Sequence, residues 1–374
     1  MAERPKAPVL KTGMEQSIVG SNPTPSALKY QLKPPQEQGM RTDSNTVEPE
    51  YKNLRTILTQ YQQPSIPRSL WQLANTLIPY MLLWYLMYLS LEFSYWLTLA
   101  IAVLAAGFMM RTFIIFHDCG HGSFFKSREA NRFIGFITGV LTFTPYDHWR
   151  HDHAIHHATA GNLDRRGTGD VQTLTLEEFQ SMSRGKRLVY RFIRHPLVMF
   201  TFGSFLVFTV FHRFYRPGSG RRERVSVHVT NLALVGLIAG LVALMGWREY
   251  LLIQVPVMLF GTSAGVWLFY VQHNFDGTYW ERQNRWSFMQ AGLKGSSFYK
   301  LPAILQWFSG NIGFHHIHHL SSLIPNYNLP RCHRENPELQ VPPLTLRRSM
   351  RSLKLRLWDE ENRRMVGFGG WLPG

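Results

Sequence analysis

The chain has 374 residues and a formal net charge of +16, with 40 Lys and Arg residues against 24 Asp and Glu. Its two cysteines, Cys119 and Cys332, exclude a disulfide framework and metal sites built mainly from thiolates. No nucleic-acid recognition motif accompanies the charge, so we expect the basic residues to face a membrane surface and expect no nucleic-acid partner.

The first 65 residues are polar, rich in proline and without sustained apolar periodicity. A segment of this kind cannot bury enough apolar surface to fold by itself. We therefore divide the chain into a disordered N-terminal tail at 1–65, a main domain at 66–337 and a C-terminal extension at 338–374.

Long apolar segments follow in two pairs, 71–90 with 93–116 and 225–247 with 250–272. Each segment approaches the roughly 20 residues that a helix needs to cross a hydrocarbon core of about 30 Å. Only a few residues separate the two members of each pair. The sequence therefore predicts an all-α integral membrane protein with four transmembrane helices in two hairpins.

Two further apolar segments, 133–144 and 196–211, are shorter. We expect the first to form an interfacial or re-entrant helix and the second to lie along the membrane interface. The region between the hairpins is rich in Arg and Lys, whereas the two tight turns contain one basic residue between them, Arg248. By the positive-inside tendency, this region and both termini are expected on the cytoplasmic side.

Eleven of the sixteen histidines lie in three short clusters, at 117–121, 148–157 and 315–319. Within each cluster, histidines recur at i, i+4 or at i, i+3, i+4, a spacing that places them on one face of a helix. Neutral imidazole is a strong ligand for iron, zinc and copper. Eight histidines have this spacing: His117, His121, His153, His156, His157, His315, His318 and His319.

Four spans would bring all three clusters to the same side of the membrane, in a cytosolic histidine-rich cap. Eight imidazoles exceed the three or four protein ligands of a usual zinc site, so the simplest interpretation is two metal ions. Iron is favoured over zinc and copper because of the number of ligands. Iron can also use O2 to attack an unactivated C–H bond, which suits a substrate reached from the bilayer.

Four segments outside the clusters extend the pattern: 161–170 (Gly-Asn-Leu-Asp-Arg-Arg-Gly-Thr-Gly-Asp), 271–280, 305–315 and 325–329. With the histidine clusters, they resemble the membrane fatty acid desaturases, specifically the acyl-lipid branch with Δ12 (omega-6) and related bacterial members. The similarity runs from about Tyr51 to Pro337. It implies an O2-dependent di-iron enzyme that introduces a cis double bond into an acyl chain of a membrane lipid.

The resemblance also implies that the eight spaced histidines bind two Fe ions, and it adds His273 as a ninth ligand. An external electron donor, either ferredoxin or cytochrome b5, is implied because no fused haem motif is present. Asp118, Asp152 and Asp276 could fix the tautomers of ligand imidazoles or could be ordinary solvated or capping residues. Asp164 and Asp170 could belong to a salt-bridged loop that covers the site or to the surface.

Two alternatives remain open from the sequence. Related di-iron hydroxylases and ketolases, which act on lipids or carotenoids, share the histidine clusters. A membrane metal transporter or storage protein would hold ions without redox chemistry, but it predicts charged residues within the spans. The spans are almost free of charge, with Arg111 near an end, so transport is disfavoured.

Overall fold

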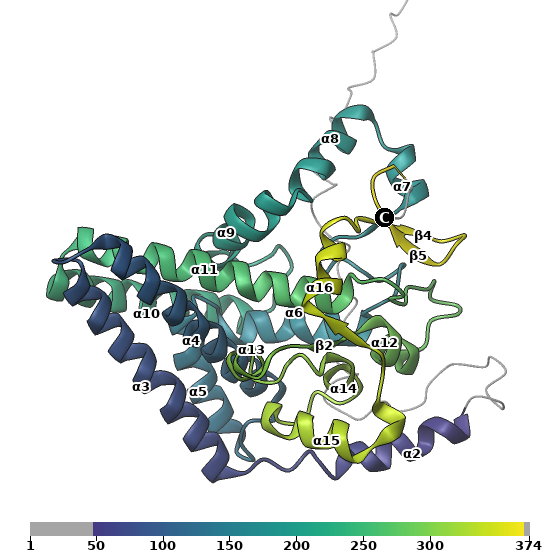
Figure 1. Cartoon of the computed structure of the whole chain (residues 1–374), viewed down its shortest axis with the longest axis horizontal. Coiled ribbons are helices and arrows are strands. Elements are labelled where there is room, and N and C mark those ends of the chain that lie inside the picture. The colour runs from purple at the N-terminus through teal and green to yellow at the C-terminus, as the bar shows by residue number, and fades with distance from the viewer. Residues whose placement is uncertain (1–47, 370–374) are drawn as a thin grey trace, which may run out of the picture. The chain divides into compact units, whose positions relative to one another are not determined.

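The computed structural model describes residues 48–369, and this part of the chain is mostly helical (Figure 1). The principal helices are α2 (Glu48–Thr59), α3 (Ile66–Ser90), α4 (Tyr95–His121), α5 (Arg128–Leu141), α6 (Tyr146–Thr159), α7 (Leu176–Ser181), α8 (Arg184–Ile193), α9 (Ser204–Thr209), α10 (Arg221–Met245), α11 (Trp247–His273), α12 (Phe288–Gly295), α13 (Ala303–Phe308), α14 (His315–Leu320), α15 (Leu329–Glu335) and α16 (Leu346–Ser349).

Five short strands form two small sheets in the described residues. In the first, β1 (Leu174–Thr175) pairs in parallel with β4 (Leu357–Asp359), which pairs antiparallel with β5 (Arg364–Val366). In the second, β2 (Phe298–Lys300) pairs in parallel with β3 (Pro343–Thr345). Both sheets therefore join the C-terminal region to segments far earlier in the chain.

Three helices of the described region, α4, α10 and α11, are long and apolar enough to cross a membrane. A fourth candidate is the bent pair of α8 with the helical segment at 198–213, which meet at 65°. The predicted segments at 93–116, 225–247 and 250–272 thus lie on helices of the expected length. The segment at 71–90 forms most of α3, which is as long but is not among these three helices.

The long helices pack along apolar faces, and α4 lies against both α3 and α11 (Figure 1). Met87 of α3, Ala105 of α4 and Ile253 of α11 are fully buried in one cluster. At its end, α4 stops where Gly122 adopts the left-handed conformation, with φ of 74°. This end carries His117 and His121 out of the apolar cluster and towards α6 and α14.

The prediction of a disordered tail at 1–65 is wrong for the last part of this range. Residues 1–47 lie outside the described residues. Residues 48–59 form α2, and its Leu54 and Leu58 are both buried. These leucines are one helical turn apart, so they face the same way and pack into the cluster that contains Leu329 and Cys332. The sequence prediction missed this helix because the apolar face of the helix is short. That face packs into a cluster that includes residues about 270 positions later in the chain.

The C-terminal extension is packed against the main domain as far as Phe368. Leu355, Leu357 and Trp358 are buried, and Trp358 shares a cluster with Leu163 and Trp280. The strand pairing of β1 with β4 makes the same connection through the backbone. The extension therefore contributes to the structure that surrounds the histidines.

Candidate metal centre

Four helix ends bring nine imidazoles into one region. His117 and His121 end α4, His273 ends α11, and the other six lie on the short helices α6 and α14. Helical spacing of i, i+3 and i+4 places the members of each set on one side of their helix. The sets on α6 and α14 are each divided between two groups. The nine are the residues named from the sequence, and all except the intermediate His121 are buried.

The nine imidazoles form two groups, each with its ligand atoms within 4.8 Å of one another. Group one contains His117, His121, His153, His157 and His318. Group two contains His156, His273, His315 and His319. The groups adjoin, since the rings of His157 and His319 stack with centroids 4.2 Å apart.

The separations between nitrogens suit metal ligands. In group two, the Nε2 atom of His273 lies 3.2 Å from Nε2 of His156 and 3.0 Å from Nε2 of His315. In group one, Nε2 of His157 lies 3.1 Å from that of His153 and 3.0 Å from that of His318. Two nitrogens bonded to one metal at about 2.0–2.1 Å, with an angle of about 90–110° between them, are about 2.8–3.4 Å apart.

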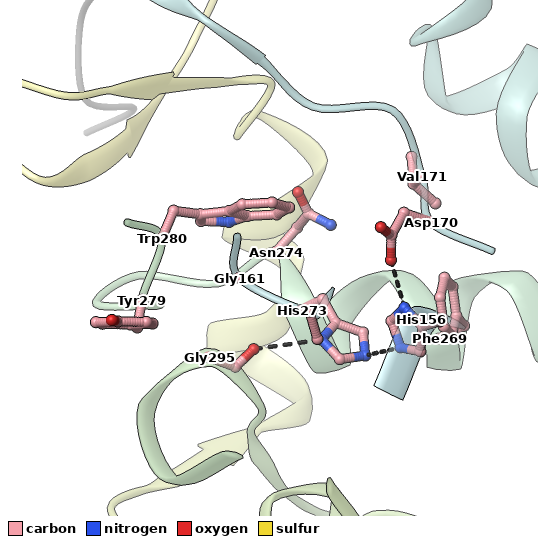
Figure 2. Close-up of a pocket in the computed structure, with 11 residues that line it drawn as sticks. His156, Gly161, Asp170, Val171, Phe269, His273, Asn274, Tyr279, Trp280 and Gly295 are labelled. Atoms are coloured by element: carbon pink, nitrogen blue, oxygen red, sulfur yellow. Dashed lines mark hydrogen bonds and ion pairs between the residues drawn. The ribbon is translucent and has the colours of Figure 1, made fainter. Parts of the chain in front are cut away.

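Hydrogen bonds on the far side of two rings define their tautomers (Figure 2). Nδ1 of His156 contacts the carboxylate of Asp170, and Nδ1 of His273 lies 3.3 Å from the carbonyl oxygen of Gly295. Both partners are acceptors, so in the neutral form of each ring Nδ1 carries the proton and Nε2 presents a lone pair. Lone pairs facing each other at 3.2 Å repel unless a cation lies between them, so the residues present fit a bound metal ion.

Burial keeps the imidazoles available as ligands. Burial and the neighbouring rings hold the pKa of His153 and His157 well below the usual value of 6.5. The same causes lower the pKa of His315, His318 and His319. A metal binds the neutral form of imidazole, so these rings need not lose a proton at neutral pH.

Asp118, Asp152 and Asp276 were considered from the sequence as possible partners of ligand imidazoles, and one of the three contacts a ring of the two groups. Asp118 Oδ1 lies 3.3 Å from Nδ1 of His117. Asp152 instead lies near His148 and Arg216, and the half-exposed Asp276 lies 3.7 Å from Arg351. The sequence placed Asp170 in a loop that covers the site or on the surface, and it gave no signal for the contact of Asp170 with His156 or of His273 with the Gly295 carbonyl.

Aromatic residues close the side of the groups that faces the long helices. The ring of Trp149 stacks on His153 with centroids 4.3 Å apart, and Phe269 of α11 contacts both His156 and His273. A cavity of about 10 Å³ borders His156, His273 and Trp280, and Phe269 also lines it. This volume corresponds to about one water molecule.

Comparison with known proteins gives consistent similarities. A family model described as "Fatty acid desaturase" matches residues 94–350. A Bacillus subtilis protein named fatty acid desaturase is 51% identical over 324 residues, which cover 86% of this chain and 92% of the relative. A Synechocystis protein named sn-1 acyl-lipid omega-3 desaturase (ferredoxin) is 30% identical over 235 residues, 59% of this chain and 62% of the relative. A second Synechocystis protein, named sn-1 oleoyl-lipid 12-desaturase, is 29% identical over 255 residues, 66% of this chain and 70% of the relative.

Proposed function

The chain belongs to the fatty acid desaturase family and is therefore an oxidoreductase, and from this premise we propose that it is an O2-dependent acyl-lipid desaturase with two iron ions. The observation that carries this proposal is the pair of adjoining buried imidazole groups. Group one would hold one iron and group two the other. Bound iron supplies one-electron redox chemistry and O2 activation, which suit the attack on an unactivated C–H bond.

The overall reaction removes two hydrogens from adjacent methylenes and leaves a cis double bond. It consumes O2, two electrons and two protons and releases two water molecules. In this reaction the chain's own residues orient the ligands and exclude bulk water. The buried rings and the aromatic contacts of Trp149 and Phe269 serve the second purpose.

We further propose Δ12 (omega-6) as the position of the new double bond. The sequence motifs resemble that branch, and one relative is named as an oleoyl-lipid 12-desaturase. An external carrier of the ferredoxin or cytochrome b5 type would supply the electrons. The name of the omega-3 relative includes ferredoxin, which supports the first of these carriers.

In the membrane, we propose that α3 crosses together with α4, α10 and α11, with the termini and the histidines on the cytoplasmic side. The short connections between α3 and α4 and between α10 and α11 support two hairpins. The Arg-rich region between the hairpins supports the orientation.

Expression in a host that lacks polyunsaturated lipids, with ferredoxin or cytochrome b5 present, tests the proposal. Gas chromatography and mass spectrometry of the lipid acyl chains should reveal a new cis double bond and locate it. His156→Ala should abolish the product, whereas His195→Ala, which changes an exposed histidine outside both groups, should not. A hydroxylated or ketonic product would support the sister oxygenases instead, and profiles equal to the empty vector with both donors would refute desaturation.

A further inference from the structure

Asp170 is held as a preformed acceptor for one ligand imidazole (Figure 2). One carboxylate oxygen, Oδ1, contacts Nδ1 of His156, and the other accepts a hydrogen bond of 3.4 Å from the backbone nitrogen of Gly167. The carboxylate and the imidazole are both buried, with side-chain exposures of 8% and 1%. A carboxylate that is itself tied to the backbone can fix the plane of the ring that it contacts.

The loop that carries Asp170 approaches α6 closely at this position. Gly169 has φ of 72°, and a Cβ atom on it would lie 2.9 Å from the carbonyl oxygen of Asp152 and 3.1 Å from Cβ of His156. Glycine is therefore needed on both conformational and steric grounds. This close approach places the next residue, Asp170, directly beside His156.

Other contacts anchor the start of the same loop. The backbone nitrogen of Leu163 donates to the carbonyl oxygen of Glu281 at 3.0 Å. The carboxylate of Asp164 accepts from Arg282 at 2.7 Å, and Arg282 in turn donates to Glu360 in the C-terminal extension at 2.9 Å. The position of Asp170 is thus fixed by the backbone turn, by the close approach to α6 and by an ion-pair network.

We propose that Asp170 is a positioning residue for His156 and controls how tightly group two retains its metal. This inference rests on the proposed function, because it assumes that group two holds an ion. By accepting the Nδ1 proton, Asp170 keeps the Nε2 lone pair of His156 directed at group two and increases its basicity.

Group two depends on this contact more than group one does. It has four imidazoles against five, and His156 is its one ligand from α6. Loss of the orientation of His156 would therefore leave three directed imidazoles. In group one, α6 contributes two rings, His153 and His157.

The experiment compares purified wild type with Asp170→Asn and Asp170→Ala, measuring iron per chain and the rate of iron release to a chelator. Loss of such a partner costs about 10–100-fold in metal affinity. Asp170→Ala should retain about one iron per chain. The iron that this variant lacks should be the ion that wild type releases fastest to the chelator. Asp170→Asn keeps an acceptor oxygen without the charge, so it should hold both ions and release one faster than wild type.

Asp276→Asn is the matched control, because Asp276 lies three residues after His273 but contacts Arg351 and no grouped imidazole. It should match wild type in both measurements. A double-variant cycle with His156→Ala then tests the route of action. Asp170→Ala should add nothing to the iron loss of His156→Ala, but it should add to the loss caused by His121→Ala in group one.

Wild-type iron content and release rates in both Asp170 variants would overturn the inference, as would full additivity with His156→Ala. Size-exclusion profiles identify variants that fail to fold, and the near-isosteric Asp170→Asn decides the question if Asp170→Ala does not fold. If wild type itself binds no iron, the proposed function fails. If wild type binds two and Asp170 has no effect, only this inference fails.

Discussion

Asn326 donates two hydrogen bonds to one oxygen of Asp118, from its backbone nitrogen at 2.7 Å and from its side-chain amide at 2.8 Å. The other oxygen of Asp118 faces Nδ1 of His117 at 3.3 Å. The buried carboxylate of Asp118 thus connects His117 to Asn326, which lies 208 positions after Asp118 in the sequence. This contact joins the end of α4 to the segment that follows the last histidine set.

Asn326→Ala should therefore destabilise the protein by about 1–3 kcal/mol, because a buried carboxylate oxygen loses one of its two donors. The thermal unfolding temperature of the detergent-solubilised protein measures the effect. Asn328→Ala, in the same motif but at a less buried position, is the control and should cost less. Equal losses for the two variants would contradict the role of the Asp118 contact.

The histidine sets could be predicted from the sequence because their geometry is local. His153, His156 and His157 lie within two turns of one helix, so spacing alone determines their common face. The division into two groups could not be predicted, because it depends on where α4, α6, α11 and α14 meet. His273 was named only through the family resemblance, since a lone histidine at the end of a helix has no spacing signal.

Contacts made by loops and by distant segments were the least predictable. Leu54 and Leu58 are buried in a cluster that includes residues far later in the chain, such as Leu329, and the contact of Asp170 with His156 depends on the turn at Gly169. The apolar face of α2 is short, and the contact of Asp170 leaves no periodic pattern in the sequence. By contrast, three of the four predicted spans lie on helices that are long and apolar enough to cross a membrane, because the length and apolarity of a helix are local properties.

Arg111 should be important for stability although it lies in a predicted span. Its Nε donates to Thr76 of α3 at 3.1 Å, its Nη1 donates to the carbonyl oxygen of Trp307, and its guanidinium lies 3.9 Å from the centre of the Trp307 ring. Arg111→Met retains an apolar stem but loses these contacts between α3, α4 and α13. We expect a loss of about 2–4 kcal/mol in unfolding free energy.

Denaturant unfolding in detergent measures this loss, with Arg248→Met, at an exposed position in the first turn of α11, as the control. That variant should stay within about 0.5 kcal/mol of wild type. If Arg111→Met were as stable as Arg248→Met, the bridging role of Arg111 would be refuted.

Gly169 and Gly167 offer a matched pair of substitutions. Both have positive φ, 72° and 109°, so alanine is strained at either position. Only at Gly169 would a new Cβ also meet neighbouring atoms, whereas nothing lies within 4 Å at Gly167. Gly169→Ala should therefore lower the unfolding temperature and speed iron release more than Gly167→Ala. The reverse order, or no difference, would contradict the close packing of the loop on α6.

Metal-free protein should lose stability as the pH falls from 7 to 5. Burial holds the pKa of His153, His157, His315, His318 and His319 well below 6.5 in the folded state, whereas in the unfolded chain it is about 6.5. Below pH 6.5 the unfolded chain therefore binds more protons, and the free energy of unfolding falls by at most about 1.4 kcal/mol per pH unit for each imidazole. Unfolding temperatures of chelator-treated protein measure this slope, and a flat profile between pH 7 and 5 would contradict it.

The iron content of the purified wild-type protein tests the central claim most directly. If the two imidazole groups each hold one ion, elemental analysis of protein isolated from iron-replete cells should give about two iron atoms per chain. Far less than one iron per chain, or a full complement of zinc in its place, would contradict the di-iron account.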